Sequence, residues 1–223
     1  NLRNPRRRNQ KSLLIMLFQS KLVVPIFLFS AAFSYGETEE IFNIPVDQLD
    51  RYQASTYTDQ VESYEMQRTR LTGKDDLIYE IIPDMVWDRD ASNVSIAFFN
   101  RWTPLNRYEV LRFPSSAVEK DFGLELVEAY LNGRALKLAE QGFEVVLPPE
   151  VTTGPARFRI LGQRTLSFSY AYLKDDQRIL RGENWVEIDG IIYIVAIEAP
   201  EPSFRNYFEM VRIAMNSMHH PKE

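Results

Sequence analysis

Three aspartates, Asp84, Asp88 and Asp90, lie in one short polar stretch and carry the groups of this chain best suited to chemistry. Two carboxylates held together serve as general acid and general base in many hydrolases. Asp88 and Asp90 also begin like a calcium-binding loop, but such a loop needs glycine and glutamate where this chain has Asn93 and Phe99. The pattern therefore predicts no metal site and favours acidic turn residues that bind backbone groups. A hydrolase or ligand-binding enzyme that uses these carboxylates is the alternative function.

Other groups used in catalysis are scarce. The chain has two histidines, His219 and His220, which are adjacent and close to its last residue, and it has no cysteine. A serine, threonine or lysine nucleophile needs an activating base, and neither a G-x-S-x-G nor an S-x-x-K motif is present. We therefore predict no catalytic residue, no metal ligands and no cofactor, and we favour a non-enzymatic protein over an enzyme.

Cations and aromatic residues are interleaved at Arg101, Trp102, Arg107 and Tyr108, as in grooves that bind single-stranded nucleic acid. Six of the 26 lysines and arginines lie in residues 1–36, which hold none of the 31 acids, so the rest of the chain has a net charge of −11. Such a charge repels nucleic acid and anionic lipid. We therefore predict that these four residues bind a partner protein. For Trp102 itself, a tryptophan packed within its own loop is the commoner arrangement, and an exposed anchor that acts as a binding hot spot is the alternative.

The first 36 residues have the layout of a secretory signal peptide. Translation from Met16 would give Lys21 as the charged region, Leu22–Phe33 as the apolar region and a cleavage site of small residues that ends at Gly36. On this interpretation the protein is periplasmic or secreted. Its partner is then expected to be another envelope protein.

An uncleaved membrane anchor over Leu13–Phe33 is the competing interpretation. Gln19 and Lys21 interrupt this stretch, whereas a membrane-spanning helix needs about 20 predominantly apolar residues. We therefore favour cleavage, and expect no stable membrane insertion after it.

Two regions are expected in the mature chain. Residues 37–70 are polar, and Val46, Leu49 and Tyr52 are spaced as in a short helical turn, which indicates an N-terminal extension packed on the domain. Residues 71–223 are expected to form a single α+β domain. It would begin with strands at 77–82, 94–99 and 108–113, which turn-rich segments separate.

A helix is predicted in the middle of the chain. Ser116 and Glu119 have the spacing of a capping box, which would start the helix there. Asn132 and Gly133 could break it, and Gly142 would cap its C-terminus. The strand that follows, 143–147, would end at the prolines of positions 148 and 149.

The last third of the chain has the clearest pattern. Aromatic and small residues alternate over 165–172, which indicates a strand with two different faces. Asp189 and Gly190 predict a two-residue hairpin turn between strands 178–188 and 191–199, and the second of these strands is apolar on both faces. Ser203 would cap a final amphipathic helix.

This order of elements, with Pro83 and Trp87 after the first strand and a strand-then-helix ending that runs from Trp185 through Tyr207, resembles the PsbP-like fold over about residues 77–218. The resemblance implies an α/β/α sandwich with a central, mostly antiparallel sheet, and within this group it is nearer to the DcrB-like periplasmic proteins. Proteins of this fold mostly bind partners or assist assembly. It therefore implies an exported, non-catalytic binding or assembly-accessory protein, with segment 100–106 as the contact point.

Overall fold

The structure is a computed structural model, and it describes residues 41–42, 44, 52–88, 96–153 and 158–222, with the side chains of 147–153 left out. The predicted signal peptide, Asp90, Val46 and Leu49 lie outside the described residues. No helix among the described residues is long and apolar enough to cross a membrane.

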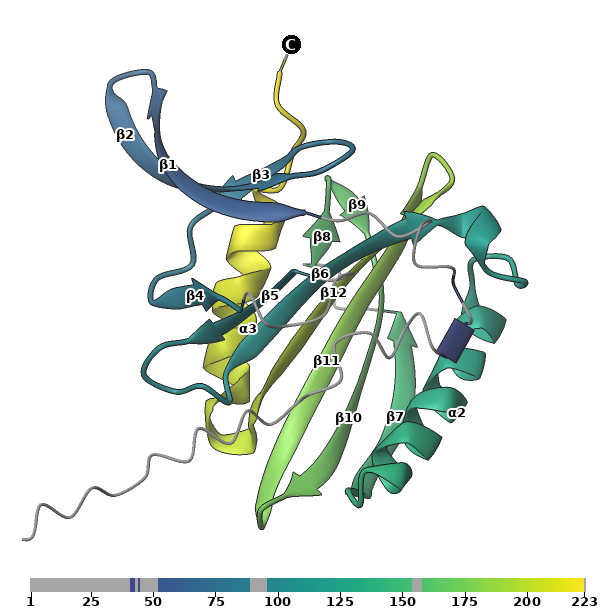
Figure 1. The fold of residues 1–223 in the computed structure, drawn as a ribbon. Coiled ribbons are helices and arrows are strands. Elements are labelled where there is room, and N and C mark those ends of the chain that lie inside the picture. The colour runs from purple at the N-terminus through teal and green to yellow at the C-terminus, as the bar shows by residue number, and fades with distance from the viewer. Residues whose placement is uncertain (1–40, 43, 45–51, 89–95, 154–157, 223) are drawn as a thin grey trace, which may run out of the picture. The chain divides into compact units, whose positions relative to one another are not determined.

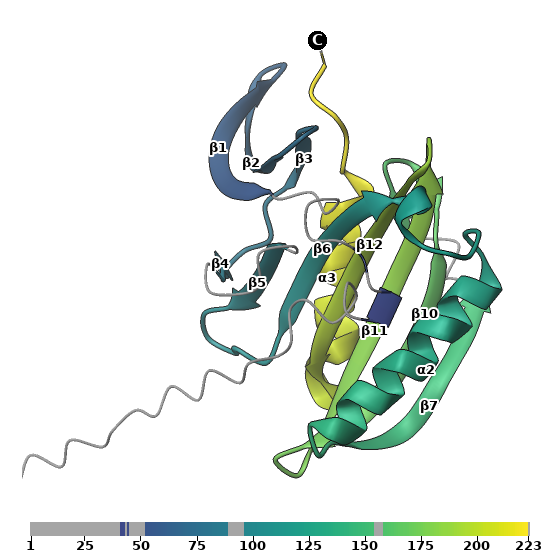
Figure 2. The ribbon, with the colours of Figure 1, turned by 45° about the vertical axis from the view of Figure 1, so that its right-hand side comes forward.

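A seven-stranded sheet forms the centre of the domain, and all of its neighbouring strands are antiparallel. In spatial order the strands are β4 (Met85–Trp87), β5 (Ile96–Asn100), β6 (Arg107–Pro114), β12 (Ile191–Pro200), β11 (Gln177–Ile188), β10 (Leu166–Lys174) and β7 (Glu144–Thr153). Helix α2 (Leu124–Glu140) and helix α3 (Glu201–Asn216) lie on opposite faces of this sheet (Figures 1 and 2). The predicted fold class, an α/β/α sandwich around an antiparallel sheet, is confirmed.

The alternation of side chains along β12 explains why both faces need a helix. Tyr193, Val195 and Ile197 belong to the core that α3 covers, whereas Ile192 and Ile194 belong to the core that α2 covers. Successive residues of a strand point to opposite faces, so a strand that is apolar throughout is stable only between two covering layers. The prediction of a central strand is confirmed.

The hairpin between β11 and β12 is also confirmed. Asp189 and Gly190 both have positive φ, 51° and 77°, as a type I′ turn requires. The turn fixes the register of the two strands over their whole length, from Ile188 opposite Ile191 to Ile179 opposite Pro200. It therefore determines which side chains of β11 face each helix.

Residues 53–72 form two strands that the sequence analysis did not predict, whereas the helical turn expected around Val46 and Leu49 falls outside the described residues. β1 (Gln53–Val61) and β2 (Tyr64–Thr72) form a hairpin that continues into β3 (Leu77–Glu80) as a separate three-stranded sheet. This sheet joins the core on the α3 side through Tyr52, which is 7% exposed, and through residues of β2 and β3. The hairpin was missed because its strands are largely polar, so they show little of the apolar alternation by which strands are recognised.

The start predicted for the central helix is wrong. Ser115–Ala117 form a 3-10 turn, and α2 begins only at Leu124, with Gly123 at its N-cap and no side-chain capping bond. Gly133 does not break the helix, because an α-helix tolerates a glycine at modest cost. A Cβ on Gly133 would lie 2.6 Å from the Cγ2 atom of Ile41, so glycine lets the N-terminal segment pack directly on α2.

Two further boundaries differ from the prediction. β7 continues past the prolines at 148 and 149 to Thr153, because it is an edge strand and its pairing with β10 contains register shifts that accommodate them. Helix α3 begins at Glu201 after Pro200, and the Ser203 hydroxyl donates to the Pro200 carbonyl, so Ser203 is not the N-cap. A proline near the helix start already supplies the required backbone angle. The described structure also contains a small hairpin of β8 (Arg159–Ile160) and β9 (Gln163–Arg164).

Candidate functional site

The loop between β5 and β6 presents Trp102 to solvent, and this side chain is 74% exposed. We call residues 100–106 the β5–β6 loop. Most large apolar side chains of the described structure are buried, so an indole at the surface is an unusual feature. This exposure differs from the packed arrangement that the sequence favoured, and it corresponds to the alternative, a tryptophan exposed in a turn.

A network of hydrogen bonds holds this loop in one conformation. The Asn100 Oδ1 atom accepts from the backbone N–H of Trp102 at 2.9 Å, and from both the backbone N–H and the hydroxyl of Thr103 at 3.1 Å. The backbone N–H of Asn106 donates to the Thr103 carbonyl at 2.8 Å, and the Asn106 carbonyl accepts from Asn100 at 2.9 Å. The indole therefore stands on a closed, internally bonded turn.

The loop is also tied to its neighbours. The Arg101 backbone N–H donates to the Asp84 carbonyl at 2.9 Å, and the side chains of these two residues lie 3.7 Å apart as an exposed ion pair. On the other side, the Ser203 hydroxyl donates to the Asn106 Oδ1 atom at 3.1 Å. The start of α3 and the β4 end of the sheet thus brace the loop.

A cavity of about 620 Å³ lies between the β5–β6 loop and the start of α3. Trp102, Pro104, Leu105 and two prolines of the β12–α3 junction supply much of its lining, which is largely apolar. Arg178 and Glu201 also line it and form an ion pair at 3.1 Å. An apolar depression beside an exposed indole is a suitable surface for an apolar side chain of a partner.

The other two residues predicted to bind, Arg107 and Tyr108, are not on this surface. Tyr108 is 1% exposed, stacks on Phe98 with ring centroids 4.6 Å apart, and shares a hydrogen bond of 2.7 Å with the Tyr79 hydroxyl. Arg107 is largely buried and pairs with Asp88 at 2.7 Å. Tyr108 belongs to β6, where period-two alternation points it into the α3-side core.

The carboxylates of the alternative function are described for Asp84 and Asp88, and each is bound to an arginine. Asp88 also borders a cavity of about 570 Å³ between the β1–β2 hairpin and β4–β5, where it is the one acid among the described lining residues. No group of three histidines, cysteines, aspartates or glutamates among the described residues could hold a metal ion. The charges of Asp84 and Asp88 are thus each compensated by an arginine.

The strongest concentration of charge lies under α2, and the sequence analysis missed it. Glu183 is 1% exposed, and its Oε1 atom accepts from Tyr130 at 2.9 Å and from the Arg181 Nε atom at 2.8 Å. Its Oε2 atom accepts from the Trp185 indole at 3.0 Å. Arg134 of α2 extends this network by donating to Tyr170 at 2.8 Å.

Arg181 connects Glu183 to two further acids. Its Nη2 atom lies 3.0 Å from Glu109, and its Nη1 atom lies 3.5 Å from Glu198. Burial raises the pKa of Glu109 above its usual value, and the opposing effect of Arg181 does not cancel this. The groups of this network, hereafter the α2-side network, satisfy one another, which is the arrangement that a structural role requires.

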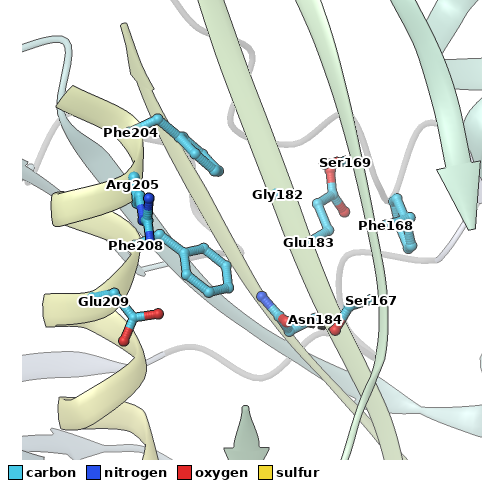
Figure 3. Close-up of a pocket in the computed structure, with 10 residues that line it drawn as sticks. All are labelled: Ser167, Phe168, Ser169, Gly182, Glu183, Asn184, Phe204, Arg205, Phe208 and Glu209. Carbon is cyan, nitrogen blue, oxygen red and sulfur yellow. Dashed lines mark hydrogen bonds between the residues drawn. The ribbon is translucent and has the colours of Figure 1, made fainter. Parts of the chain in front are cut away.

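A third cavity, of about 250 Å³, lies on the face of the sheet opposite α2, between α3 and strands β10 and β11 (Figure 3). Phe204 and Phe208 line it from the helix, and Ser167, Ser169 and Gly182 line it from the sheet. The small face predicted for the strand at 165–172 forms part of this lining. We call this space the α3 cavity.

The sequence contained a signal for both features. Arg181, Glu183 and Trp185 are two residues apart on a predicted strand, so they share one face, and a face with two charges and an indole is not an ordinary solvated one. For the α3 cavity, the signal was the row of small residues on β10 together with Gly182 on β11. Without the register between strands, neither pattern identifies its neighbours.

No family model matches this chain, and no curated protein matches it. Among solved structures, it is similar to cyanobacterial PsbP (CyanoP) from Synechocystis, with 16% identity, coverage of 75% of this chain and 92% of that one, and a TM-score of 0.38. The Ran-binding protein Mog1p of Saccharomyces cerevisiae matches at 12% identity, 74% and 96% coverage, and a TM-score of 0.39. LpqN of Mycobacterium tuberculosis, which is involved in cell envelope biogenesis, matches at 8% identity, 77% and 92% coverage, and a TM-score of 0.37.

PsbP is thus among the structures that this chain is similar to, as the sequence resemblance predicted. With TM-scores of 0.37 to 0.39 and identities of 8% to 16%, these similarities concern the fold and carry no information on partner or activity. Function has to be argued from this chain's own side chains.

Proposed function

We propose that this protein is an exported, non-catalytic binding or assembly-accessory protein that contacts another envelope protein through its β5–β6 loop. The single observation that carries the proposal is Trp102, an indole that is 74% exposed on a loop fixed by its own hydrogen bonds. Export rests on the signal-peptide pattern of residues 1–36.

Burial of the indole supplies the driving force for binding. Covering a large apolar side chain contributes about 1.5 to 3 kcal/mol, and tryptophan is among the residues that most often dominate protein interfaces. A loop that is already ordered also loses less conformational entropy when it binds. The bonds from Asn100 therefore matter for affinity although Asn100 need not touch the partner.

The chemistry of the surface indicates the kind of partner. Trp102 and Leu105 offer apolar area, while the nearby charges are already paired, Arg101 with Asp84 and Arg178 with Glu201. Paired charges at the edge of an apolar patch suit a protein interface with a dry centre and a polar rim. The partner is accordingly expected to present an apolar side chain or a shallow apolar groove.

Site-specific photo-crosslinking in the producing cells tests this proposal. A benzophenone amino acid replaces Trp102 in one variant and Tyr64 in the other, because Tyr64 is an aromatic side chain of nearly equal exposure, 72% against 74%. A discrete crosslinked adduct from position 102 that position 64 does not give is the expected result. Identical adducts from both positions, or none from position 102, would overturn the proposal.

A further inference from the structure

We propose that the α3 cavity binds a small aromatic carboxylate. This site is separate from the β5–β6 loop, and the inference does not depend on the proposed function. It rests on three features of the cavity lining, namely an aromatic wall and, within the part of the chain that the structure describes, a hydroxyl without a partner and an arginine without an ion pair.

The aromatic wall is formed by Phe204 and Phe208, one turn apart on α3. Their ring centroids lie 5.8 Å apart at an interplanar angle of 35°, and Phe158 packs against Phe208 from the far side at 5.6 Å. Both phenylalanines are only partly buried and line the cavity, so part of their ring surface faces it (Figure 3). Flat aromatic ligands pack well on such rings in offset or tilted arrangements.

The sheet opposite this wall leaves the space open because its side chains are small. A Cβ on Gly182 would lie 3.1 Å from the Phe204 Cζ atom and 3.6 Å from the Phe208 Cε2 atom, so the glycine lets the two rings pack close to β11. Gly182 does not have a positive φ, so the backbone itself does not require glycine here. Close approach of the rings to the sheet is what this glycine allows, and the small side chains of Ser167 and Ser169 line the cavity beside them.

The two serine hydroxyls that line the cavity from the sheet differ in whether they have a hydrogen-bond partner. The Ser167 hydroxyl donates to Asn184 at 2.7 Å, and Asn184 is fully buried and donates to the Val195 carbonyl at 3.5 Å. For the Ser169 hydroxyl, which also lines the cavity, no hydrogen-bond partner is found among the described residues. Ser169 is therefore the hydroxyl available to a ligand.

The charge at the rim selects an anion. Arg205 lines the cavity and has no ion pair within the described part of the chain, whereas Glu209, one turn further on, is bound by Arg212 at 2.7 and 2.9 Å. The negative charge at the rim is thus compensated, and the positive one is not. A guanidinium group binds carboxylates through two parallel hydrogen bonds, so a carboxylate fits this rim better than a cation or a neutral group.

The volume limits the size of the ligand. At about 30 Å³ for one water molecule, a space of about 250 Å³ holds on the order of ten non-hydrogen atoms. This corresponds to one aromatic ring with a carboxylate and a small substituent. A ligand of this size with ordinary contacts is expected to bind with a Kd in roughly the millimolar range or tighter.

Benzoate and benzamide are suitable probes, because they have the same size and shape and differ in charge. We expect benzoate to shift the backbone amide resonances of Ser169, Gly182 and Phe208 in NMR titrations of the protein. Benzamide is expected to bind about two- to fivefold more weakly, as the loss of one exposed ion pair predicts. In Arg205→Gln the two probes are expected to bind equally, whereas the matched variant Arg101→Gln, in the β5–β6 loop, should keep the difference.

Two variants close the cavity from different strands. Gly182→Val displaces the Phe204 ring that packs on this glycine, and Ser169→Leu adds a large side chain to the cavity from β10, so the two variants change the cavity in different ways. Both should abolish the shifts from either probe. Unchanged benzoate binding in a folded cavity-filling variant, or shifts that map elsewhere on the protein, would overturn the site. A benzoate preference that survives Arg205→Gln would overturn the role of Arg205.

Discussion

The Glu183 cluster under α2 and the surfaces proposed to bind differ in how their polar and aromatic side chains are used. On the α2 side, Glu183 and Arg181 are buried and bind one another and their neighbours, so that every oxygen of Glu183 has a partner. On the α3 side and at the β5–β6 loop, Ser169 and Trp102 are left open to solvent or to a cavity. The α2-side network, although it concentrates the most charge, is therefore expected to stabilise the fold. Binding is expected where groups lack partners.

The largest effect on stability is expected for Glu183→Ala. The substitution leaves the Arg181 guanidinium and the indole N–H of Trp185 without their shared acceptor in a buried site. Removing one partner of a buried ion pair costs about 3 to 5 kcal/mol of unfolding free energy. Urea unfolding measures this loss of unfolding free energy. The control is Glu187→Ala, at an exposed glutamate of the same strand, which is expected to change the unfolding free energy by less than about 0.5 kcal/mol. Similar losses from both variants would mean that the network is not structural.

A smaller and pH-dependent effect is expected for Glu109→Gln. Burial raises the pKa of Glu109 in the folded protein, so between the unfolded value of 4.5 and the raised value the folded state binds more protons than the unfolded state. Wild-type stability therefore falls as the pH rises through this window, by roughly 1.4 kcal/mol for each unit of the pKa shift. The glutamine variant lacks this loss.

The measurement for Glu109 is the difference in unfolding free energy between Glu109→Gln and the wild type across the pH range. This difference should move in favour of the variant as the pH rises above 4.5 and then level off. Glu187→Gln, on the exposed part of β11, should give a flat difference. A trend of opposite sign would show that Arg181 stabilises the ionised form of Glu109 more than burial opposes it.

Some features of the fold could be predicted from the sequence alone. The turn at Asp189 and Gly190 was predictable, because only a few residue types accept two successive positive φ angles, and it fixed the β11–β12 register. Tyr108 could have been assigned to the core, because it lies within a predicted strand and shares a face with Val110. The exposure of Trp102 was not predictable in the same way, because a tryptophan in a turn more often packs within its own loop.

Other features were not predictable from one sequence. The partners of Glu183 come from α2, β10 and β11, and only the folded register brings Tyr130 and Tyr170 to one carboxylate. The β1–β2 hairpin was not predicted because its polar strands show little alternation of apolar and polar residues, although Thr56, Tyr57 and Thr58 are residues that favour strands. The α3 cavity depends on how far α3 lies from β10, which no local pattern specifies.

A moderate effect is expected for Asn100→Ala, which tests whether the β5–β6 loop is fixed before it binds. The variant removes the acceptor of the Trp102 and Thr103 amides, and the loss of exposed hydrogen bonds costs about 1 kcal/mol locally. Hydrogen exchange of those two amides should become about fivefold faster. Thr103→Val, which removes only the side-chain bond to Asn100, should change the Trp102 amide much less. Equal exchange in all three proteins would show that Asn100 does not order the loop.

The smallest effect on stability is expected for Trp102→Ala. The side chain is 74% exposed, so its removal should change the unfolding free energy by less than about 0.5 kcal/mol. Thermal unfolding provides the measurement. A loss of several kcal/mol would show that the indole packs in the folded protein and would end the contrast between the α2-side network and the surfaces proposed to bind.

The affinity for the crosslinked partner tests the central claim most directly. Isothermal titration of that partner with wild type, Trp102→Ala and Tyr64→Ala compares two aromatic side chains of nearly equal exposure. If Trp102 is the anchor, its removal costs at least about 2 kcal/mol and raises Kd about 30-fold, while Tyr64→Ala leaves Kd unchanged within about twofold. Equal Kd values for Trp102→Ala and wild type would contradict the account.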